Sequence, residues 1–434
     1  MRTLSLSDIG RIVTGKTPPT SDQSNYGGAV PFVTPSDMDG RRCIERTLRC
    51  LTEAGAQVVR SSRVQGPAVV VSCIGSDMGK SAVVRGDFVT NQQINTIILN
   101  AGIDPLYVYY NLSARRAEIR NLAGGAAQPI MNKSTFGALP IKLPDFAEQV
   151  AIGRVLGSLD DKIELNRRMN ETLEAMAQAI FRDWFVDFGP VRRKLAGATD
   201  PIAIMGGLTP DPARAAELVA LFPAALGEDE LPLGWRLMAL SDVATHCKGA
   251  VDPQKSPQTL FEHYSLPAYD AGQEPARDPG ASIKSNKVLV PPGAVLVSKL
   301  NPEILRVWAP NDYVGAPQVA STEFLVFTPK PAAGRGLLYF LFRDPTVRQI
   351  MEGMVTGTSK SHQRISPPAL LQTKLVVGDP GAFAAFEELV DPVLRRSLAL
   401  RAESRTLAEM RDYLLPRLMS GEIRVGDVNC EIAA

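Results

Sequence analysis

The stretch AEQVAIGRVLGSLDDKIELNRRMNETLEAMAQAIFRDWFVDF, residues 147–188, decides how this chain folds. Apolar and small residues recur along it at alternating steps of four and three, which is the heptad seam of a long helix that packs against another helix. The seam comprises Ile152, Leu156, Leu159, Ile163, Asn166, Asn170, Leu173, Ala177, Ile180 and Trp184. We therefore predict one helix from about Phe146 to Phe188, with a length of roughly 65 Å.

Two kinds of residue interrupt this seam. Asn166 and Asn170 lie in its middle, where buried amides fix the register and the partner at some cost in stability. Gly153 and Gly157 lie near its start, where each weakens a helix by up to ~1 kcal/mol relative to alanine. We expect the helix to be least stable at that end.

A second heptad seam lies near the end of the sequence. Asp391-Pro392 offers an N-cap and a first-turn proline, and a helix that follows them should stop at Ser420-Gly421. Its seam comprises Val393, Ser397, Leu400, Ser404, Leu407, Arg411, Leu414 and Leu418. Two such helices predict an antiparallel coiled coil that holds two globular domains apart.

The globular parts form an internal repeat. LSDI (6–9) recurs as LSDV (240–243), and GPAVVVS (66–72) recurs as GAVLVS (293–298). PLYVYYNLSARRAEIRNLAGG (105–125) aligns with GLLYFLFRDPTVRQIMEGMVTG (336–357), and we expect both to be amphipathic, arginine-rich helices. PIKLPDFAEQVA (140–151) aligns with TKLVVGDPGAFAAFEELV (373–390). A two-fold pseudo-repeat therefore organises the chain.

The repeat predicts the fold class and the domain boundaries. Short β-branched runs at 68–73, 94–99, 288–290, 295–297 and 324–327 alternate with turns and helices, which indicates an α+β fold with a mixed or mostly antiparallel sheet. We expect domains at 1–145 and 231–380, coiled-coil helices at 146–188 and 381–420, and a tail at 421–434. The Pro- and Gly-rich connector at 189–230 should carry one short helix at most, at 212–221.

The stretch GRIVTGKT, residues 10–17, matches the phosphate-loop pattern. A phosphate loop needs a helix that begins at the Lys-Thr pair, but Pro18 and Pro19 follow and disfavour one there. The second copy, SDVATHCKGAVDP, keeps a glycine without the Lys-Thr pair. We therefore interpret the stretch as a turn between a short helix and a strand.

Composition and motifs do not predict an enzyme. The chain has a formal net charge of +1, five scattered cysteines without a C-x-x-C pair, and three histidines, so we expect no metal site and no cofactor. Asn301-Pro302-Glu303-Ile304 lacks the second proline and the aromatic residue of an adenine-methyltransferase motif. With no membrane-length apolar run and no signal region, we expect a cytoplasmic protein.

Basic residues gather in the same element of both copies. Residues 113–142 contain five Lys or Arg against one acid, and residues 335–374 contain six against two. Such an excess favours salt-sensitive DNA binding, and polar side chains nearby can read base edges. The candidate DNA contacts are Lys16, Arg41, Arg42, Lys80, Gln92, Gln93, Gln128, Asn132, Lys133, Lys299, Asn301, Lys360, His362, Gln363 and Arg364.

Four segments resemble the specificity subunits of Type I restriction-modification systems. They are LSDIGRIVTGKTPPT with VPFVTPSDM, the central helix quoted above, LPLGWRLMALSDVA, and LLPRLMSGEIRV, and together they span nearly the whole chain. Repeat one lacks the Pro-x-Gly-Trp lead-in that repeat two has at Pro232, Gly234 and Trp235.

The resemblance implies a non-catalytic DNA-recognition subunit. Two target-recognition domains would each read one half of a split site in double-stranded DNA, and two antiparallel helices would set the spacing. The helices would dock two methyltransferase subunits, which carry S-adenosylmethionine, and motor-nuclease subunits can join. Two alternatives remain: an assembly scaffold that does not bind DNA, and a stand-alone methyltransferase or nuclease, for which we find no motif.

Overall fold

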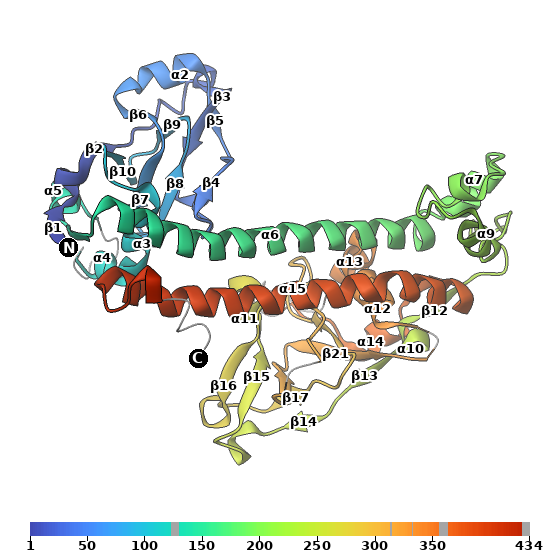
Figure 1. The fold of residues 1–434 in the computed structure, drawn as a ribbon. Coiled ribbons are helices and arrows are strands. Elements are labelled where there is room, and N and C mark those ends of the chain that lie inside the picture. Colours follow the sequence, from blue (N-terminus) through green and yellow to red (C-terminus); the bar gives the residue numbers. More distant parts are fainter. Residues whose placement is uncertain (123–129, 313–314, 332, 356–362, 428–434) are drawn as a thin grey trace. The chain divides into compact units, whose positions relative to one another are not determined.

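The computed structural model describes residues 1–122, 130–312, 315–331, 333–355 and 363–427 (Figure 1). The chain divides into two compact units, unit 1 with residues 1–167 and 402–434, and unit 2 with residues 168–401. Each unit contains an α/β part, which we call head 1 in unit 1 (residues 1–145) and head 2 in unit 2 (residues 236–378). Each also contains one segment of both long helices, α6 (Phe146–Phe185) and α15 (Pro380–Ser420).

Head 1 is built on two sheets and a two-stranded ribbon. The ribbon pairs β1 (Arg2–Ser5) with β11 (Pro140–Leu143). The first sheet has the order β2 (Gly10–Thr14), β10 (Ile94–Leu99), β7 (Ala68–Ser72), β8 (Ser81–Val84), β4 (Cys43–Ile44). The second has the order β5 (Cys50–Leu51), β3 (Tyr26–Val33), β9 (Asp87–Thr90), β6 (Arg63–Gln65). The helices are α1 (Leu6–Ile9), α2 (Glu53–Val58), α3 (Pro105–Ala114), α4 (Arg116–Leu122) and α5 (Lys133–Gly137).

Head 2 repeats this plan. Its ribbon pairs β12 (Arg236–Ala239) with β22 (Lys374–Gly378). The first sheet has the order β13 (Ala244–Cys247), β21 (Phe324–Pro329), β18 (Val295–Ser298), β19 (Val307–Trp308). The second has the order β14 (Ala250–Val251), β17 (Lys287–Leu289), β20 (Gln318–Ala320), β15 (Leu260–Tyr264), β16 (Ala276–Pro279). The helices are α10 (Leu240–Val243), α11 (Leu266–Gly272), α12 (Arg335–Arg343), α13 (Pro345–Gly353) and α14 (Pro367–Gln372).

These topologies confirm the α+β class and the repeat. In each head the first sheet is made mainly of antiparallel pairs, and the second sheet contains one parallel pair, β3 with β9 and β15 with β20. The β-branched runs predicted as strands include the central strands β7 and β18, which are buried at every position. A strand buried on both faces reads as a continuous apolar run.

The long helices run antiparallel within each unit. In unit 1, Asp160 of α6 bonds to Arg411 of α15, and Asn166, six residues further along α6, bonds to Glu403, which lies earlier in α15. In unit 2, Glu174 of α6 pairs with Arg401 of α15, and Phe181, seven residues further along α6, makes an edge-to-face contact with Phe386, which lies earlier in α15. The heptad seams are confirmed, since every seam residue of both helices is buried or half-buried.

The prediction that Asp391 caps the second long helix is wrong. The helix α15 begins at Pro380, after Asp379, whose carboxylate accepts a hydrogen bond from the Gly381 amide at 2.8 Å. The same Asp-Pro signature therefore occurs earlier in the chain. Helix continues through Pro392 because buried residues at helical spacing, Ala382, Phe383, Phe386 and Val390, hold this turn against the core of unit 2.

The connector after α6 is more regular than predicted. It forms three helices, α7 (Gly189–Leu195), α8 (Pro201–Ile204) and α9 (Pro212–Ala220), whereas we predicted one at most. Its prolines start helices instead of breaking them, because Asp200 and Asp211 each cap a helix whose first residue is proline. Val191, Leu218 and Phe222 fill the unit 2 core.

The arginine-rich elements also differ from the prediction. Each is two consecutive helices, α3 with α4 and α12 with α13, and the middle parts of α3 and α12 are buried on every side, whereas α13 is amphipathic as predicted. Residues 107–112 of α3 and residues 336–342 of α12 are all buried. Both helices pack between a sheet and the long helices, so apolar residues are needed all round.

Candidate nucleic-acid interface

Four segments of head 1 meet at one edge, which we call junction 1. The ends of β2 and β7, the turn from β9 to β10, and the segment before α5 are joined there by backbone hydrogen bonds. The amide of Lys16 donates to the Thr90 carbonyl at 2.9 Å, and the amide of Cys73 donates to the Gln93 carbonyl at 2.7 Å. The amide of Met131 in turn donates to the Cys73 carbonyl at 2.9 Å. Sequence-distant candidates, Lys16 with Gln92 and Gln93, are thereby brought together.

Carboxamide groups dominate the side chains of junction 1. Gln92 is exposed, and its Oε1 accepts a hydrogen bond from the Thr17 hydroxyl. Gln93 is half-buried, and its Oε1 accepts from Asn91 Nδ2 at 3.0 Å. Lys16 is exposed beside them. This edge therefore offers hydrogen-bonded amide groups together with the exposed ammonium group of Lys16.

The segment that leads into α5 adds Asn132 and Lys133. Asn132 is the N-cap of α5, and its Oδ1 accepts from the Thr135 amide at 2.8 Å and from the Ser134 hydroxyl at 2.7 Å. That oxygen therefore stabilises the start of the helix. Lys133 is exposed in the first turn.

Head 2 forms an equivalent edge, junction 2, from the same backbone contacts. The amide of Lys299 donates to the Glu323 carbonyl at 3.0 Å, and the amide of Ile365 donates to the Lys299 carbonyl at 3.0 Å. The isolated bridge between Ile74 and Ile130 of head 1 recurs as the bridge between Leu300 and Arg364. Junction 2 thus gathers the candidates Lys299, Asn301, Gln363 and Arg364.

Junction 2 adds a second lysine, Lys248, to Lys299. Burial, followed by the charges of Lys248 and Lys299, lowers the pKa of His246. The charges of Lys248 and Lys299 thus act on His246, and neither His246 nor Lys248 is among the candidates predicted from the sequence. Lys248 precedes the glycine that both copies share, so a closer comparison of SDVATHCKG with SDIGRIVTG would have drawn attention to it.

Two of the junction 2 candidates have structural roles as well. Arg364 forms an ion pair with Glu323, at 3.1 Å from Nε to Oε2. Asn301 adopts a left-handed backbone conformation, with φ of 49°, in the turn after β18, and its amide donates to the Gln363 carbonyl at 3.2 Å. Its buried Oδ1 has no hydrogen-bond partner within the residues that the structure describes.

Three further candidates lie beside or away from junction 1. Lys80 flanks it, because its carbonyl accepts from the Ser72 amide, and its ammonium pairs with Asp77 at 2.7 Å. Arg42 instead packs against α6, donating to the Gly157 carbonyl at 2.8 Å and pairing with Asp161 at 2.5 Å. That packing leaves Arg42 out of the candidate interface.

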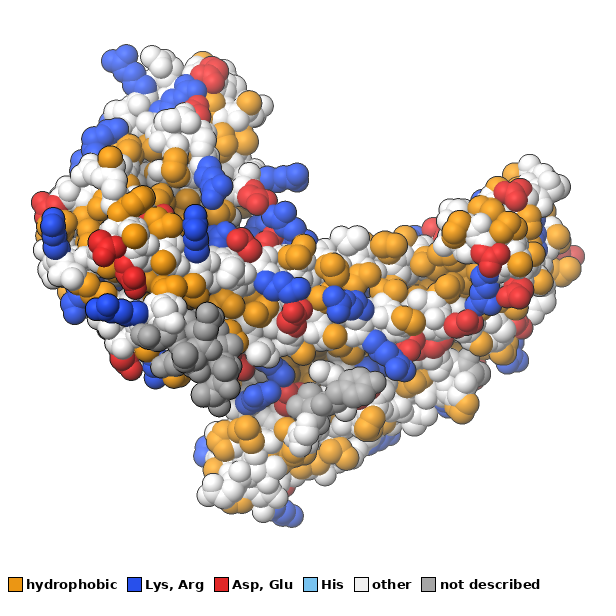
Figure 2. Space-filling view, viewed as in Figure 1, with side chains coloured by type: hydrophobic (Ala, Val, Ile, Leu, Met, Phe, Trp, Pro, Cys, Tyr) orange, Lys and Arg blue, Asp and Glu red, His pale blue; other side chains and the backbone are white. Residues whose placement is uncertain are grey.

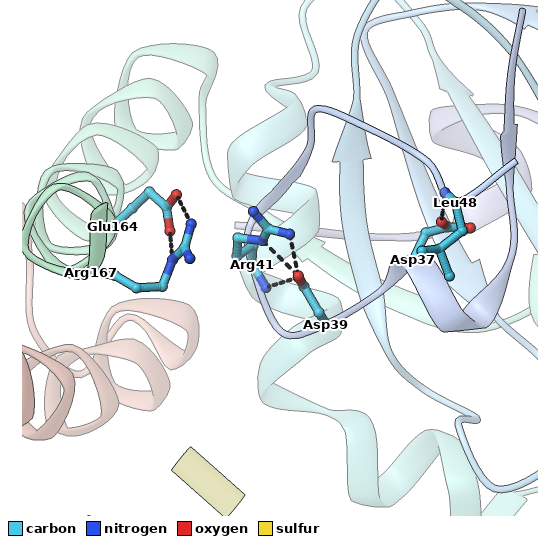
Figure 3. Close-up of polar contacts among 6 residues, drawn as sticks. All are labelled: Asp37, Asp39, Arg41, Leu48, Glu164 and Arg167. Carbon is cyan, nitrogen blue, oxygen red and sulfur yellow. Dashed lines mark hydrogen bonds and ion pairs between the residues drawn. The ribbon is translucent and has the colours of Figure 1, made fainter. Parts of the chain in front are cut away.

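Arg41 lies on a loop that faces α6 rather than junction 1. It is paired with Asp39, and Figure 3 shows the Glu164–Arg167 pair of α6 on the side of the loop that carries Arg41. Asp37 holds the loop closed, because its carboxylate accepts from the Thr34 and Leu48 amides, each at 2.7 Å. Gln128, Lys360 and His362 lie outside the described residues.

Many arginines of the two basic segments form ion pairs within their own unit. Arg115 pairs with Glu118 at 2.7 Å, Arg335 with Asp312 at 3.0 Å, and Arg343 with Glu174 at 3.0 Å. On the face drawn in Figure 2, Lys and Arg side chains are scattered rather than gathered into one patch. A DNA contact would thus depend on a few placed groups more than on a broad basic surface.

The Gly15 position explains the stretch that imitates a phosphate loop. A Cβ at Gly15 would lie 2.0 Å from the Asn91 carbonyl oxygen, so the glycine is needed for close backbone contact. No helix begins at Lys16-Thr17, and the Lys16 amide is already bonded to Thr90. The prediction of a turn between a short helix and a strand is wrong in its position, because α1 is followed directly by β2 (Gly10–Thr14) and Gly15 lies after that strand.

The described part of the chain offers neither a metal-binding cluster nor a membrane-spanning helix. No group of three or more His, Cys, Asp or Glu side chains there is placed to hold a metal ion. Every helix there is also too short or too polar to cross a bilayer.

Comparisons with known proteins agree with this architecture of two related heads and two long helices. Residues 1–175 match the family model described as the Type I restriction modification DNA specificity domain. The chain is 24% identical over 446 residues to the Type I restriction enzyme MjaIX specificity subunit of Methanocaldococcus jannaschii, covering 98% of this chain and 93% of that protein. It is 25% identical over 335 residues to the HindI specificity subunit of Haemophilus influenzae, covering 68% and 71%.

The fold is also that of a solved protein. The crystal structure of the Type I restriction-modification S subunit from M. genitalium superimposes with a TM-score of 0.56 at 13% identity, over 96% of this chain and 95% of that one. Residues 1–175 thus carry a Type I restriction modification DNA specificity domain, and nearly the whole chain is similar to Type I specificity subunits.

Proposed function

We propose that this chain is the DNA-recognition and scaffold subunit of a Type I restriction-modification complex. Heads 1 and 2 act as target-recognition domains, within residues 1–145 and 231–380, and each reads one half of a split site. The long helices, within 146–188 and 381–420, act as the spacer. The observation that carries the proposal is that the two junctions share two equivalent backbone hydrogen bonds but differ in their side chains.

The side chains at the junctions suggest what each half-site contains. Glutamine and asparagine amides pair best with adenine in the major groove, whereas lysine and arginine pair best with guanine. Junction 1 presents Gln92 and Gln93, and junction 2 presents Lys248 and Lys299. The two half-sites should therefore differ, with an adenine contacted by head 1 and a guanine contacted by head 2.

The long helix α6 offers a surface for partner subunits. Met169 and Met176 in unit 2 are exposed, and each immediately precedes a residue of the heptad seam. They therefore form an apolar stripe beside the helix pair, which suits docking of helices from other subunits. We assign this stripe to the methyltransferase subunits, which supply S-adenosylmethionine and the methyl transfer that this chain does not catalyse.

The experiment is to co-express the chain with its methyltransferase partner and to map methylated adenines in host DNA. A split, non-palindromic motif is the expected result. Gln92→Ala should relax one position in one half-site, and Lys299→Ala should relax one position in the other, each by roughly 5- to 150-fold, since one good base contact contributes about 1–3 kcal/mol. Lys142→Ala, which removes an exposed lysine of β11, is the matched control.

Methylation without a motif would contradict the proposal, as would a variant that changes both half-sites equally. Gel shifts with selected and random duplexes over a salt series address the assembly-scaffold alternative. A DNA reader loses affinity steeply as salt rises, because phosphate contacts release counterions. Absence of any salt-dependent binding would leave the scaffold role alone. Methyl transfer by the purified chain with S-adenosylmethionine would instead make it an enzyme.

A further inference from the structure

Each head rests on a long helix through the first turn of one of its own helices. In unit 1 this is α3, whose N-cap is Asp104, and Asp104 Oδ1 accepts from the Tyr107 amide at 2.9 Å. The facing residue of α6 is Gly153. A Cβ at Gly153 would lie 2.9 Å from Asp104 Oδ1 and 3.0 Å from Leu106 Cβ, so the helix leaves room for the carboxylate of the head.

Unit 2 makes the same contact with the roles exchanged. The N-cap of α12 is Gly334, which has no side chain to cap the helix. The cap comes from α15, where Glu387 accepts from the Gly336 amide at 3.1 Å and from the Leu337 amide at 3.2 Å. A Cβ at Gly334 would lie 1.8 Å from Glu387 Cδ, so here the head leaves room for the carboxylate of the long helix.

The two contacts occupy corresponding places in the repeat. Gly153 and Glu387 are each the eighth residue of their long helix, counted from Phe146 and Pro380. Asp104 and Gly334 each immediately precede the head helix that rests there. One carboxylate therefore satisfies the first-turn amides in both units, but it belongs to the head in unit 1 and to the long helix in unit 2.

We propose that each head is matched to its own long helix by this reciprocal glycine–carboxylate pair. Head 1 fits a helix with glycine at the eighth position, and head 2 fits a helix with an acidic residue there. Exchanging the heads would set Asp104 against Glu387, two carboxylates in a partly buried contact. It would also set Gly334 against Gly153, which leaves the first-turn amides of α12 without an acceptor.

The proposal predicts which heads such a chain can accept. A recognition domain that replaces head 1 needs a capping residue of its own, and one that replaces head 2 needs a glycine before its first-turn helix. The match concerns assembly of each unit and does not depend on DNA binding. It can therefore fail while the proposed function holds, and the reverse is also true.

A double-mutant cycle in the full-length chain tests the match. Glu387→Gly removes the cap, and Gly334→Asp places a second carboxylate where Glu387 lies. Each single variant should lower the apparent midpoint of thermal unfolding by roughly 5–10 °C. The double variant G334D/E387G recreates the unit 1 arrangement, since an aspartate at 334 can accept from the Leu337 amide as Asp104 accepts from Tyr107. It should recover more than half of the larger single loss.

Glu388→Gly is the matched control for placing a glycine in α15, because Glu388 is exposed on the same turn. Amide hydrogen exchange gives a second readout that does not depend on reversible unfolding. The Leu337 amide should exchange faster in E387G and regain protection in the double variant. A double variant whose loss equals or exceeds the sum of the single losses, with Leu337 still unprotected, would overturn the proposal.

Discussion

Replacing Glu174 by glutamine should destabilise unit 2 far more than the loss of a surface ion pair would. Glu174 lies on α6 with a side chain only 13% exposed. Its carboxylate pairs with Arg343 of head 2 at 3.0 Å and with Arg401 of α15 at 2.5 Å. It also accepts from the Tyr339 and Ser397 hydroxyls, each at 3.3 Å. One carboxylate therefore joins the head to both long helices.

The magnitude follows from what the substitution leaves behind. Glutamine keeps the size and one acceptor oxygen, but two guanidiniums that are about three-quarters buried or more lose their counter-charge. Removing one partner of a buried ion pair costs about 3–5 kcal/mol, and the retained acceptor favours the lower end of that range. A loss of about 3 kcal/mol should lower the unfolding midpoint of a unit of this size by roughly 6–12 °C.

Differential scanning calorimetry of the full chain measures this shift. The matched control is Glu388→Gln, which removes an ion pair of 2.8 Å with Arg214, also in unit 2 but with the glutamate 68% exposed. Exposed pairs contribute about 0–1 kcal/mol, so the control should shift the midpoint by at most a few degrees. The E174Q shift should persist at 1 M salt, because buried charges are poorly screened. Equal shifts for the two variants would refute the reasoning.

Two other substitutions test head 1. Gly15→Ala should lower the thermal unfolding midpoint of unit 1 strongly, because its Cβ would lie 2.0 Å from the Asn91 carbonyl oxygen. The control Gly249→Ala should be nearly neutral, because the nearest atom to its Cβ is Leu289 Cβ at 3.5 Å. Similar effects at both sites would count against the close-contact explanation. Burial raises the pKa of Tyr107 from 10.0 to about 12. Its neutral phenol therefore stabilises the fold fully below pH 10, and that contribution is lost as the pH rises through 12. Denaturant unfolding at stepped alkaline pH should show a steeper loss of stability in the wild type than in Tyr107→Phe, and parallel curves would exclude this origin.

Periodic features were readable from the sequence because they are local. The seam of α6 needed only the spacing of residues such as Ile152, Leu156 and Trp184, and all three are buried. The buried strands β7 and β18 were readable as apolar runs, and the absence of a helix at Lys16-Thr17 was readable from the prolines that follow. The start of α15 could not be read from the sequence, because two Asp-Pro pairs carry the same capping signal. Packing against the unit 2 core decides between them.

The candidate site was readable only in part. The sequence supplied Lys16, Gln92 and Lys299, but it could not show that backbone hydrogen bonds bring them to two equivalent edges. The sequence also could not show that Arg42 packs against α6, because its partners there lie more than a hundred residues away along the chain. His246 was missed for the same reason, whereas Lys248 could have been found from its place before the glycine that both copies share.

The sequence by itself determined the two-fold repeat, the heptad seams and the central strands, since each follows from the spacing of side chains along a few turns or one strand. Tertiary structure alone decided which charged side chains form ion pairs within a unit, where junctions 1 and 2 form, and which residue caps each helix. Gly153 and Glu387 illustrate the difference. From the sequence, Gly153 only weakens its helix and Glu387 is an ordinary helical glutamate. Their contacts with the heads become visible only in the tertiary structure. Whether a carboxylate or a glycine is favourable there depends on a neighbour that is distant in sequence.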